Sequence, residues 1–180
     1  SEQVKIAIKN IFKVFKRVDV LVNSAGIPHG KLFLMSQKEE IYNVFETNFF
    51  SLLYFTQSIA RIMGRNKKGS IVNISSISAF RFDEGTLAYG ASKAALNFAT
   101  SILAKELAPQ GIRVNAVAPG ITNTSMLKNM DKNAINKQVN DSSLKKIATP
   151  LEIAAVVSFL CNSSSSHITG QVIKVDGGQL

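Results

Sequence analysis

The sequence is poor in cysteine and proline and lacks tryptophan. Its 180 residues contain one cysteine, Cys161, four prolines and no tryptophan. A single thiol excludes an intrachain disulfide and a cysteine-based zinc cluster, and it suits a reducing compartment. Charged residues interrupt the apolar stretches well before the roughly 20 residues that span a bilayer, and the chain does not open with the pattern of a signal peptide. These absences predict a cytoplasmic protein with no membrane contact.

The charge of the chain is strongly positive. Lys and Arg number 21 against 12 Asp and Glu, a net charge of +9, in a composition that is 46% hydrophobic. This composition is typical of a globular protein, and the length fits a single domain. The first lysines alternate with apolar residues at helical spacing, and the other basic residues are scattered along the chain. We therefore predict a solvated surface and no nucleic-acid partner, with phosphate-driven binding as the weaker alternative.

Apolar periodicity predicts helices that alternate with strands. Helices are expected at about 3–17, 87–107 and 151–160, and a longer one runs to about Met63 after a capping box of Ser36 and Glu39. Strands are expected at 18–22, 71–74, 112–117 and 172–175. The polar stretch 122–146 is expected to be mobile. This alternation predicts an α/β fold, a doubly wound parallel sheet with helices on both faces.

One predicted helix carries a pair of residues suited to catalysis. Tyr89 and Lys93 are four residues apart, which places them one turn apart on one helix face. A cation beside a phenol favours phenolate, so we expect the pKa of Tyr89 to lie below its usual value of about 10. Such a phenol suits general acid catalysis. The same spacing also occurs by chance in amphipathic helices. Other residues of the sequence must therefore show whether this pair is catalytic.

The neighbours complete a pattern around this pair. Ser76 ends a predicted strand thirteen residues before Tyr89, and the segments Asn23-Ser-Ala-Gly26 and Pro119-Gly120 follow two other strands. Together with Asn48 in the long helix, these residues resemble the short-chain dehydrogenase/reductase family, from about residue 18 to Gly178. The resemblance implies a Rossmann-type fold.

Longer sequence motifs narrow the resemblance to a subfamily. Gly111-Ile-Arg-Val-Asn-Ala-Val-Ala-Pro-Gly120, Ile168-Thr-Gly-Gln171 and Val175-Asp-Gly-Gly178 look most like the 3-oxoacyl-acyl-carrier-protein reductases of fatty acid biosynthesis. The same phrases also occur in sugar, steroid and secondary-alcohol reductases of the family. The subfamily is therefore less sharply defined than the family.

The resemblance assigns catalytic roles. Tyr89 would donate a proton to the carbonyl oxygen, and Ser76 would hydrogen-bond the same oxygen. Lys93 would hold the nicotinamide ribose and depress the pKa of Tyr89. Asn48 would distort its helix locally and position a water for proton relay from Lys93.

The resemblance also implies a cofactor, NADP or NAD. The residues that would hold it are Tyr89, Lys93, Asn23, Ala25, Gly26, Pro119, Gly120, Ile121 and Thr124. Ser24 departs mildly from the family, which usually has a second asparagine at this position. We expect no metal, because the two histidines are far apart and lack a ligand pattern.

One family feature is missing from the sequence. The family has a glycine-rich turn, Thr-Gly-x-x-x-Gly-x-Gly, after its first strand, where backbone amides reach the cofactor pyrophosphate. No such run occurs in these 180 residues. We therefore expect one domain over 1–180 that represents the C-terminal half of the fold and lacks the first three strands. Two explanations stay open, an omitted N-terminal portion, which is favoured, and a natural truncation. The strand at 18–22 would form an exposed apolar edge only if these residues existed alone.

The sequence thus predicts an NAD(P)H-dependent reductase. The favoured substrate is a 3-oxoacyl thioester, small or bound to an acyl carrier, with 122–146 as a lid. The alternatives are reduction of another carbonyl (sugar, steroid or secondary alcohol) and a non-catalytic scaffold of the same fold. The helices at about 39–63 and 88–108 resemble the pair that forms a four-helix contact in this family, so a homodimer or homotetramer is expected.

Overall fold

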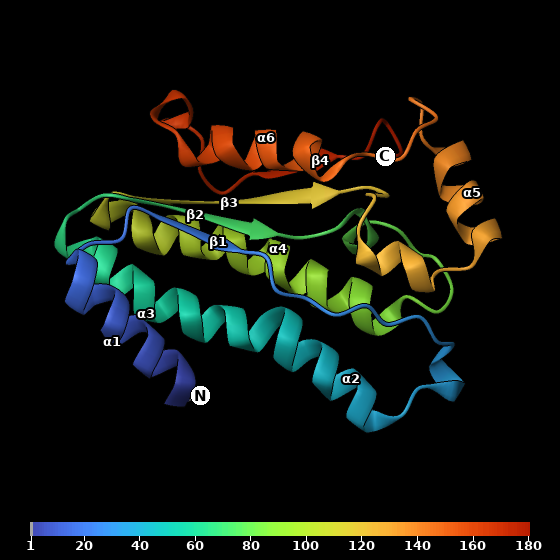
Figure 1. The fold of residues 1–180 in the computed structure, drawn as a ribbon, viewed down its shortest axis with the longest axis horizontal. Helices are drawn as coiled ribbons and strands as arrows, with labels where there is room; N and C mark the ends of the chain where they lie inside the picture. The colour runs from blue at the N-terminus through green and yellow to red at the C-terminus, as the bar shows by residue number, and fades with distance from the viewer. Residues whose placement is uncertain (1) are drawn as a thin grey trace.

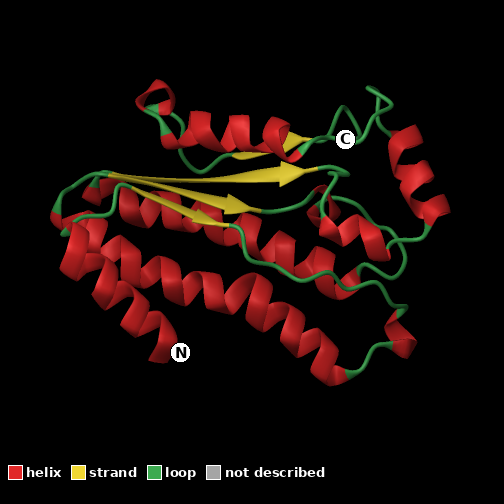
Figure 2. Ribbon diagram, in the orientation of Figure 1, coloured by secondary structure: helices red, strands yellow, loops and turns green. Residues whose placement is uncertain are grey.

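The computed structural model describes the backbone of residues 2–180 and the side chains of residues 6–127 and 130–180. Its centre is a parallel sheet in the order β1-β2-β3-β4. The strands are β1 (Val20–Asn23), β2 (Gly69–Ile74), β3 (Ile112–Pro119) and β4 (Val172–Val175). All four point the same way in Figure 2, so their carboxyl ends meet at one edge of the sheet. The predicted α/β architecture is confirmed.

Helices cover both faces of this sheet (Figure 1). On one face lie α1 (Glu2–Phe15), α2 (Lys38–Phe45), α3 (Ser51–Arg65) and α4 (Leu87–Leu107), and on the other lies α6 (Pro150–Cys161). The short helix α5 (Lys132–Asp141) lies beyond the carboxyl ends of the strands. Short 3₁₀ turns occupy Phe33–Met35, Ile77–Ala79, Ala108–Gln110, Ser125–Asn129 and Ser163–Ser165.

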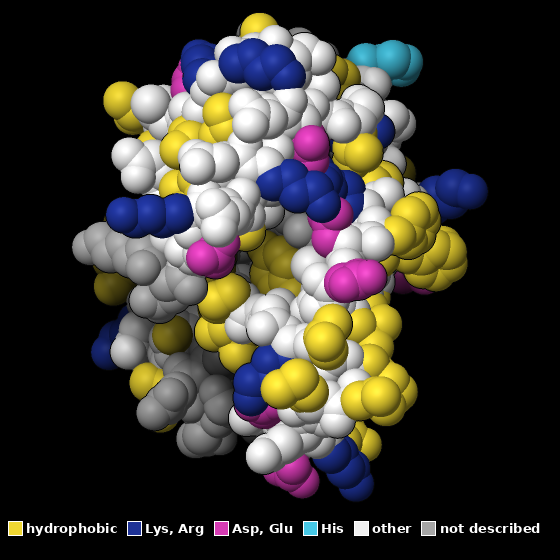
Figure 3. Space-filling model, turned by 90° about the vertical axis from the view of Figure 1, so that its right-hand side faces the viewer, with side chains coloured by type: hydrophobic (Ala, Val, Ile, Leu, Met, Phe, Trp, Pro, Cys, Tyr) yellow, Lys and Arg dark blue, Asp and Glu magenta, His cyan; other side chains and the backbone are white. Residues whose placement is uncertain are grey.

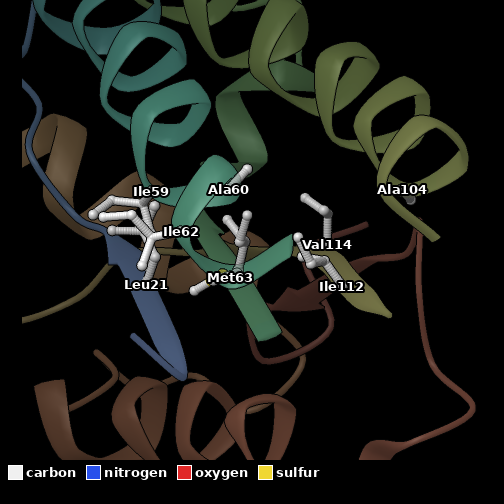
Figure 4. Packing of buried hydrophobic residues seen from close by; sticks show 9 residues of the cluster. Leu21, Ile59, Ala60, Ile62, Met63, Ala104, Ile112 and Val114 are labelled. Carbon is white, nitrogen blue, oxygen red and sulfur yellow. The ribbon is translucent and has the colours of Figure 1, made fainter. Parts of the chain in front are cut away.

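The sheet has a hydrophobic core on each face, because successive side chains of a strand point to opposite faces. Ile71 of β2 and Val114 of β3 pack with Ile59 and Met63 of α3 on one face (Figure 4). The next residue of β2, Val72, points to the other face and packs against α6. Both central strands are covered on two sides, which explains why nearly all of their residues are buried.

Strand β1 is half-buried rather than fully buried. It pairs with β2 along one side and forms an edge of the sheet in the described part of the chain. Leu21 packs into the core, while Val20 and Val22 are 39% and 40% exposed. The strand begins at Val20, two residues later than predicted.

The predicted capping box at Ser36 and Glu39 is wrong by one residue. Gln37 caps α2, and Glu40 returns the interaction by accepting a 3.0 Å hydrogen bond from the Gln37 amide. The Ser36 hydroxyl instead donates to the Leu32 carbonyl at 3.1 Å, which ties it to the preceding 3₁₀ turn.

The stretch 122–146 contains a helix that the sequence analysis did not predict. Helix α5 begins after Asp131, whose carboxylate accepts hydrogen bonds from the amides of Asn133 and Ala134. At its other end, Asp141 accepts a 3.0 Å hydrogen bond from Arg81, so an ion pair joins α5 to the loop after β2. No helix within residues 2–180 is long and apolar enough to cross a membrane.

Candidate active site

A cavity of about 900 Å³ opens at the edge where β1, β2 and β3 end. Its walls come from the loop after each strand, from the start of α4 and from α6, which lie far apart in the sequence. Figure 3 shows this side of the molecule, with a hollow near its centre that has hydrophobic side chains inside. Ligands of open α/β sheets bind in such a position.

Tyr89 and Lys93 both line this cavity from one side of α4. The helix begins at Leu87, so both residues lie in its first two turns. The Lys93 ammonium nitrogen is 5.9 Å from the centre of the Tyr89 ring and donates a 2.8 Å hydrogen bond to the Ile74 carbonyl. Lys93 is 3% exposed. Its burial lowers the pKa of Lys93 to about 8, because desolvation disfavours the ammonium.

The pKa of Tyr89 lies above its usual value, opposite to the prediction from sequence. Burial of the phenol is the main cause, and the side chain of Ser76 acts weakly in the other direction. The Lys93 amine is directed to Ile74 and is itself desolvated, so it does not offset this effect. The phenol of Tyr89 therefore stays protonated through neutral pH.

Ser76 follows β2 directly and is nearly buried. Its backbone is extended, and its hydroxyl oxygen accepts a 3.1 Å hydrogen bond from the Ser78 amide, which starts a 3₁₀ turn. The preceding residue, Ser75, extends the sheet pairing through a 2.7 Å bond from its amide to the Val117 carbonyl. These bonds hold Ser76 at the cavity wall beside Tyr89, with which its side chain hydrogen-bonds.

Asn48 lies in a π-helical turn, Glu46–Phe50, between α2 and α3. The local distortion implied by the resemblance is therefore present. Asn48 is fully buried. Its Oδ1 accepts from the Ile27 amide at 2.8 Å, and its Nδ2 donates to the Ile27 carbonyl at 3.0 Å and to Ser92 at 3.2 Å. The side chain thus clamps the loop after β1, and its polar atoms are engaged with protein groups.

Asn23 points away from the cavity. Its Nδ2 donates to Thr56 and to Asn73, both at 2.8 Å, and Asn73 in turn donates to Thr100 at 2.9 Å. This buried polar chain joins β1 and β2 to α3 and α4. Among the described residues, the cavity wall includes Gly26 of the predicted loop but neither Asn23 nor Ala25. The family resemblance implies a cofactor contact for Asn23, whereas its side chain bonds to Thr56 and Asn73, which the sequence does not identify as partners.

The segment after β3 forms the opposite wall. Pro119, Gly120, Ile121 and Thr124 all line the cavity, as predicted. The Gly120 amide donates to the Val175 carbonyl at 2.9 Å, so β4 fixes the turn. A side chain at Gly120 would place its Cβ 2.8 Å from the Asp176 Cα, which explains the glycine.

Several lining residues were not predicted. They are His29, Met126, Leu127, Met130, Gln138 and Ile153, and most lie in or beside the polar stretch that was expected to be mobile. The spacing of the methionines gave no periodic signal. Among the side chains that the structure describes, at 6–127 and 130–180, no group of three His, Cys, Asp or Glu is placed to hold a metal ion.

Comparisons with known proteins agree with this geometry. A family model described as enoyl-(acyl carrier protein) reductase matches residues 1–179. The chain is 38% identical over 168 residues to 3-oxoacyl-[acyl-carrier-protein] reductase FabG of Buchnera aphidicola subsp. Baizongia pistaciae, covering 93% of this chain and 69% of that protein. It is 39% identical over 178 residues to FabG of Aquifex aeolicus, covering 99% and 72%. The solved structure of ElxO with NADP bound has a TM-score of 0.92 at 34% identity, over 99% of this chain and 73% of that one.

The cavity fits the nicotinamide end of a dinucleotide. A Cβ at Gly26 would lie 3.4 Å from both Asn48 Oδ1 and Lys93 Nζ, so glycine leaves more room at this wall than a residue with a side chain. Lys93 uses one donor on Ile74, and an ammonium has three. Thr124 makes no cap bond within the described residues. Lys93 and Thr124 thus offer polar contacts from two walls.

The family model covers almost the whole chain, and both curated relatives exceed 35% identity over most of it. The chain therefore belongs to the short-chain dehydrogenase/reductase family and is an NAD(P)-dependent oxidoreductase that reduces carbonyl groups.

Proposed function

We propose that this enzyme reduces the ketone of a 3-oxoacyl thioester to an alcohol, with Tyr89 as the proton donor. One observation carries the proposal: a phenol held protonated by burial lies at the cavity wall beside the hydroxyl of Ser76. The names of the curated relatives support the substrate class, since they are 3-oxoacyl-[acyl-carrier-protein] reductases. A cytoplasmic location stays a prediction.

Each side chain of the site has a separate role in the reduction. The nicotinamide cofactor supplies a hydride to the carbonyl carbon when bound. Ser76 donates a hydrogen bond to the carbonyl oxygen and stabilises the negative charge that develops there. Tyr89 transfers its phenolic proton to the same oxygen, so the C=O double bond becomes an alcohol C–OH. Lys93 would hold the cofactor ribose, with its amine 5.9 Å from the centre of the Tyr89 ring, and solvent returns the proton to the phenolate that remains.

The basic surface favours an acidic carrier for the acyl group. The chain carries a net charge of +9, and complementary charge accelerates encounter with an anionic partner. We therefore include a carrier-bound thioester in the proposed substrate class. Other carbonyl substrates and an enoyl thioester are the alternatives, the latter because of the description of the matching family model.

The test uses Tyr89→Phe, which removes only the phenolic oxygen. Oxidation of NADPH and of NADH is followed with acetoacetyl-CoA, with crotonyl-CoA as an enoyl substrate and with a simple ketone. We expect turnover of acetoacetyl-CoA to fall about 10²- to 10⁴-fold, the usual contribution of a general acid, while cofactor binding persists. Tyr42→Phe, at an exposed position of α2 outside the cavity, is the matched control.

Three results would contradict the proposal. Unchanged turnover in Tyr89→Phe would remove this residue from the reaction. Wild-type activity on crotonyl-CoA alone would replace ketone reduction with enoyl reduction. Activity confined to the simple ketone would leave a reductase with another substrate.

A further inference from the structure

His29 is a buried polar residue of the cavity that the mechanism does not use. Its side chain is 8% exposed, and it lines the same cavity as Ser76 and Tyr89. Neither ring nitrogen has a hydrogen-bond partner among the described residues. Buried polar atoms are nearly always paired, so an unpaired imidazole at the wall of a ligand cavity calls for a partner that enters the cavity.

The nearest acid does not serve as that partner. Glu40 Oε2 is 3.8 Å from His29 Nε2, beyond hydrogen-bond distance. Both carboxylate oxygens of Glu40 are already engaged, Oε2 by the Gln37 amide in the capping box and Oε1 by Lys31. Glu40 is therefore committed to the start of α2.

The loop around His29 is fixed on both sides. Asn48 clamps the amide and the carbonyl of Ile27, and the Lys31 amide donates to the Gly85 carbonyl at 3.0 Å. Pro28 restricts the backbone between them. The loop backbone is thus held in position before any ligand arrives, and only the imidazole has to turn to present a ring nitrogen, now covered, to the cavity.

The position of this loop favours the substrate as the partner. Strand β2, which leads to Ser76, lies between β1 and β3 in the sheet. His29 follows β1, whereas the segment with Thr124 follows β3, so the two lie on opposite sides of Ser76. A 3-oxoacyl thioester has a second carbonyl, separated from the reduced ketone by one methylene group. That oxygen also needs a donor once it leaves water.

We propose that His29 is a substrate-binding residue whose ring N–H hydrogen-bonds to the thioester carbonyl oxygen. This assignment rests on the proposed function, because it requires a substrate with that second oxygen. It gives the site two polar contact points: Ser76 and Tyr89 at the ketone, and His29 at the thioester. A ketone without the thioester uses only the first.

The experiment compares two substrates in His29→Ala and His29→Gln. For acetoacetyl-CoA we expect His29→Ala to raise KM at least about tenfold, as loss of one buried hydrogen bond implies, with little change in kcat. For a simple methyl ketone, KM should be nearly unchanged. His29→Gln, which keeps an N–H donor, should recover most of the loss. The exposed His167, changed to alanine, is the matched control.

A binding measurement provides a second readout. In the wild-type enzyme saturated with NADP⁺, acetoacetyl-CoA should shift the imidazole NMR signals of His29 and leave those of His167 in place. Assignment comes from the His29→Gln variant, so the measurement does not depend on the alanine variant being folded.

The outcomes separate the two proposals. Wild-type enzyme that reduces acetoacetyl-CoA, with KM unaffected in His29→Ala or with no shift of the His29 signals, overturns the role of His29 and leaves the proposed function standing. An equal rise in KM for both substrates also overturns it, since that result indicates a structural role. Wild-type enzyme inactive on acetoacetyl-CoA and active on another ketone overturns the proposed substrate.

Discussion

At the scale of single residues, the burial of Lys93 disfavours the positive charge of its amine. The amine is almost completely buried, and one 2.8 Å hydrogen bond to the Ile74 carbonyl is its only bond to another residue in the described part of the chain. Desolvation lowers the pKa of Lys93 from 10.5 to about 8. Holding this residue protonated therefore costs the folded state free energy, which the site accepts in order to keep a cation beside Tyr89.

The lowered pKa of Lys93 predicts that the free energy of unfolding rises with pH. Below pH 8 the amine is protonated in both states, and the full penalty applies. Between about pH 8 and 10.5 the unfolded chain binds a proton that the folded chain does not, so the free energy of unfolding increases with pH. We expect a gain on the order of 1 kcal/mol from pH 7.5 to 9, a window below the ionisation of tyrosine. Urea denaturation across this range measures it.

The variant Lys93→Met should lose this gain, because it has no titrating amine. Lys105→Met removes an exposed lysine of the same helix and should keep the wild-type dependence. A pH dependence that is the same in wild type and Lys93→Met would show that Lys93 has an ordinary pKa.

The same residues show what sequence can and cannot predict at this scale. The convergence of Ser76, Tyr89 and Lys93 on one cavity was predictable, because helical spacing and strand ends fix their positions. The direction of the Tyr89 pKa was not, since spacing identifies a neighbour but says nothing about desolvation. Asn23 illustrates a further limit: its partners Thr56 and Asn73 come from other elements, and only the folded chain brings them together.

At the scale of elements, the π-helical turn connects two parts of the site. It places the amide of Asn48 against the loop after β1, where it pairs with both backbone groups of Ile27. The same loop carries Gly26 and His29 into the cavity wall. The distortion of one helix thus sets the position of a loop that lies about twenty residues earlier in the chain.

We predict that Asn48→Leu, which is similar in size, destabilises the protein by about 2–4 kcal/mol because buried partners lose their hydrogen bonds. The effect should be local as well as global, so hydrogen exchange at the Ile27 amide should accelerate more than exchange in β2. Asn66→Ala, at the exposed end of α3, should change stability by less than about 0.5 kcal/mol. Unchanged protection of Ile27 would show that the clamp does not hold the loop.

The ends of a helix were predictable where the sequence contains strong helix breakers. Helix α4 has the predicted limits of Leu87 and Leu107, since Pro109 and Gly111 stop it, and Gly111 takes a positive φ of 71°. Helix α5 was missed because its sequence is polar and its cap, Asp131, is not followed by an apolar stripe. Contacts with the rest of the fold, such as the ion pair between Arg81 and Asp141, supply what the local sequence lacks.

At the scale of the whole molecule, two helices each expose a pair of apolar side chains four residues apart. Phe50 precedes α3 directly and Tyr54 lies within it, four residues apart, and they are 39% and 60% exposed. On α4, Phe98 and Ile102 have the same spacing and are 72% and 39% exposed. Residues four apart share a helix face, so each helix presents an apolar stripe to solvent. Both helices cover the same face of the sheet (Figure 1).

These stripes lead us to expect a homodimer in which α3 and α4 of two copies pack together, as the family resemblance implies. Contiguous exposed apolar surface of this kind usually marks an interface. The variant Phe98→Glu places a charge in the stripe and should convert the dimer to a monomer in sedimentation velocity, without loss of helical content. Phe82→Glu, in a loop outside these helices and fully exposed, should sediment as wild type does. A wild-type monomer at micromolar concentration would contradict the dimer, and an intact dimer in Phe98→Glu would place the interface elsewhere on the surface.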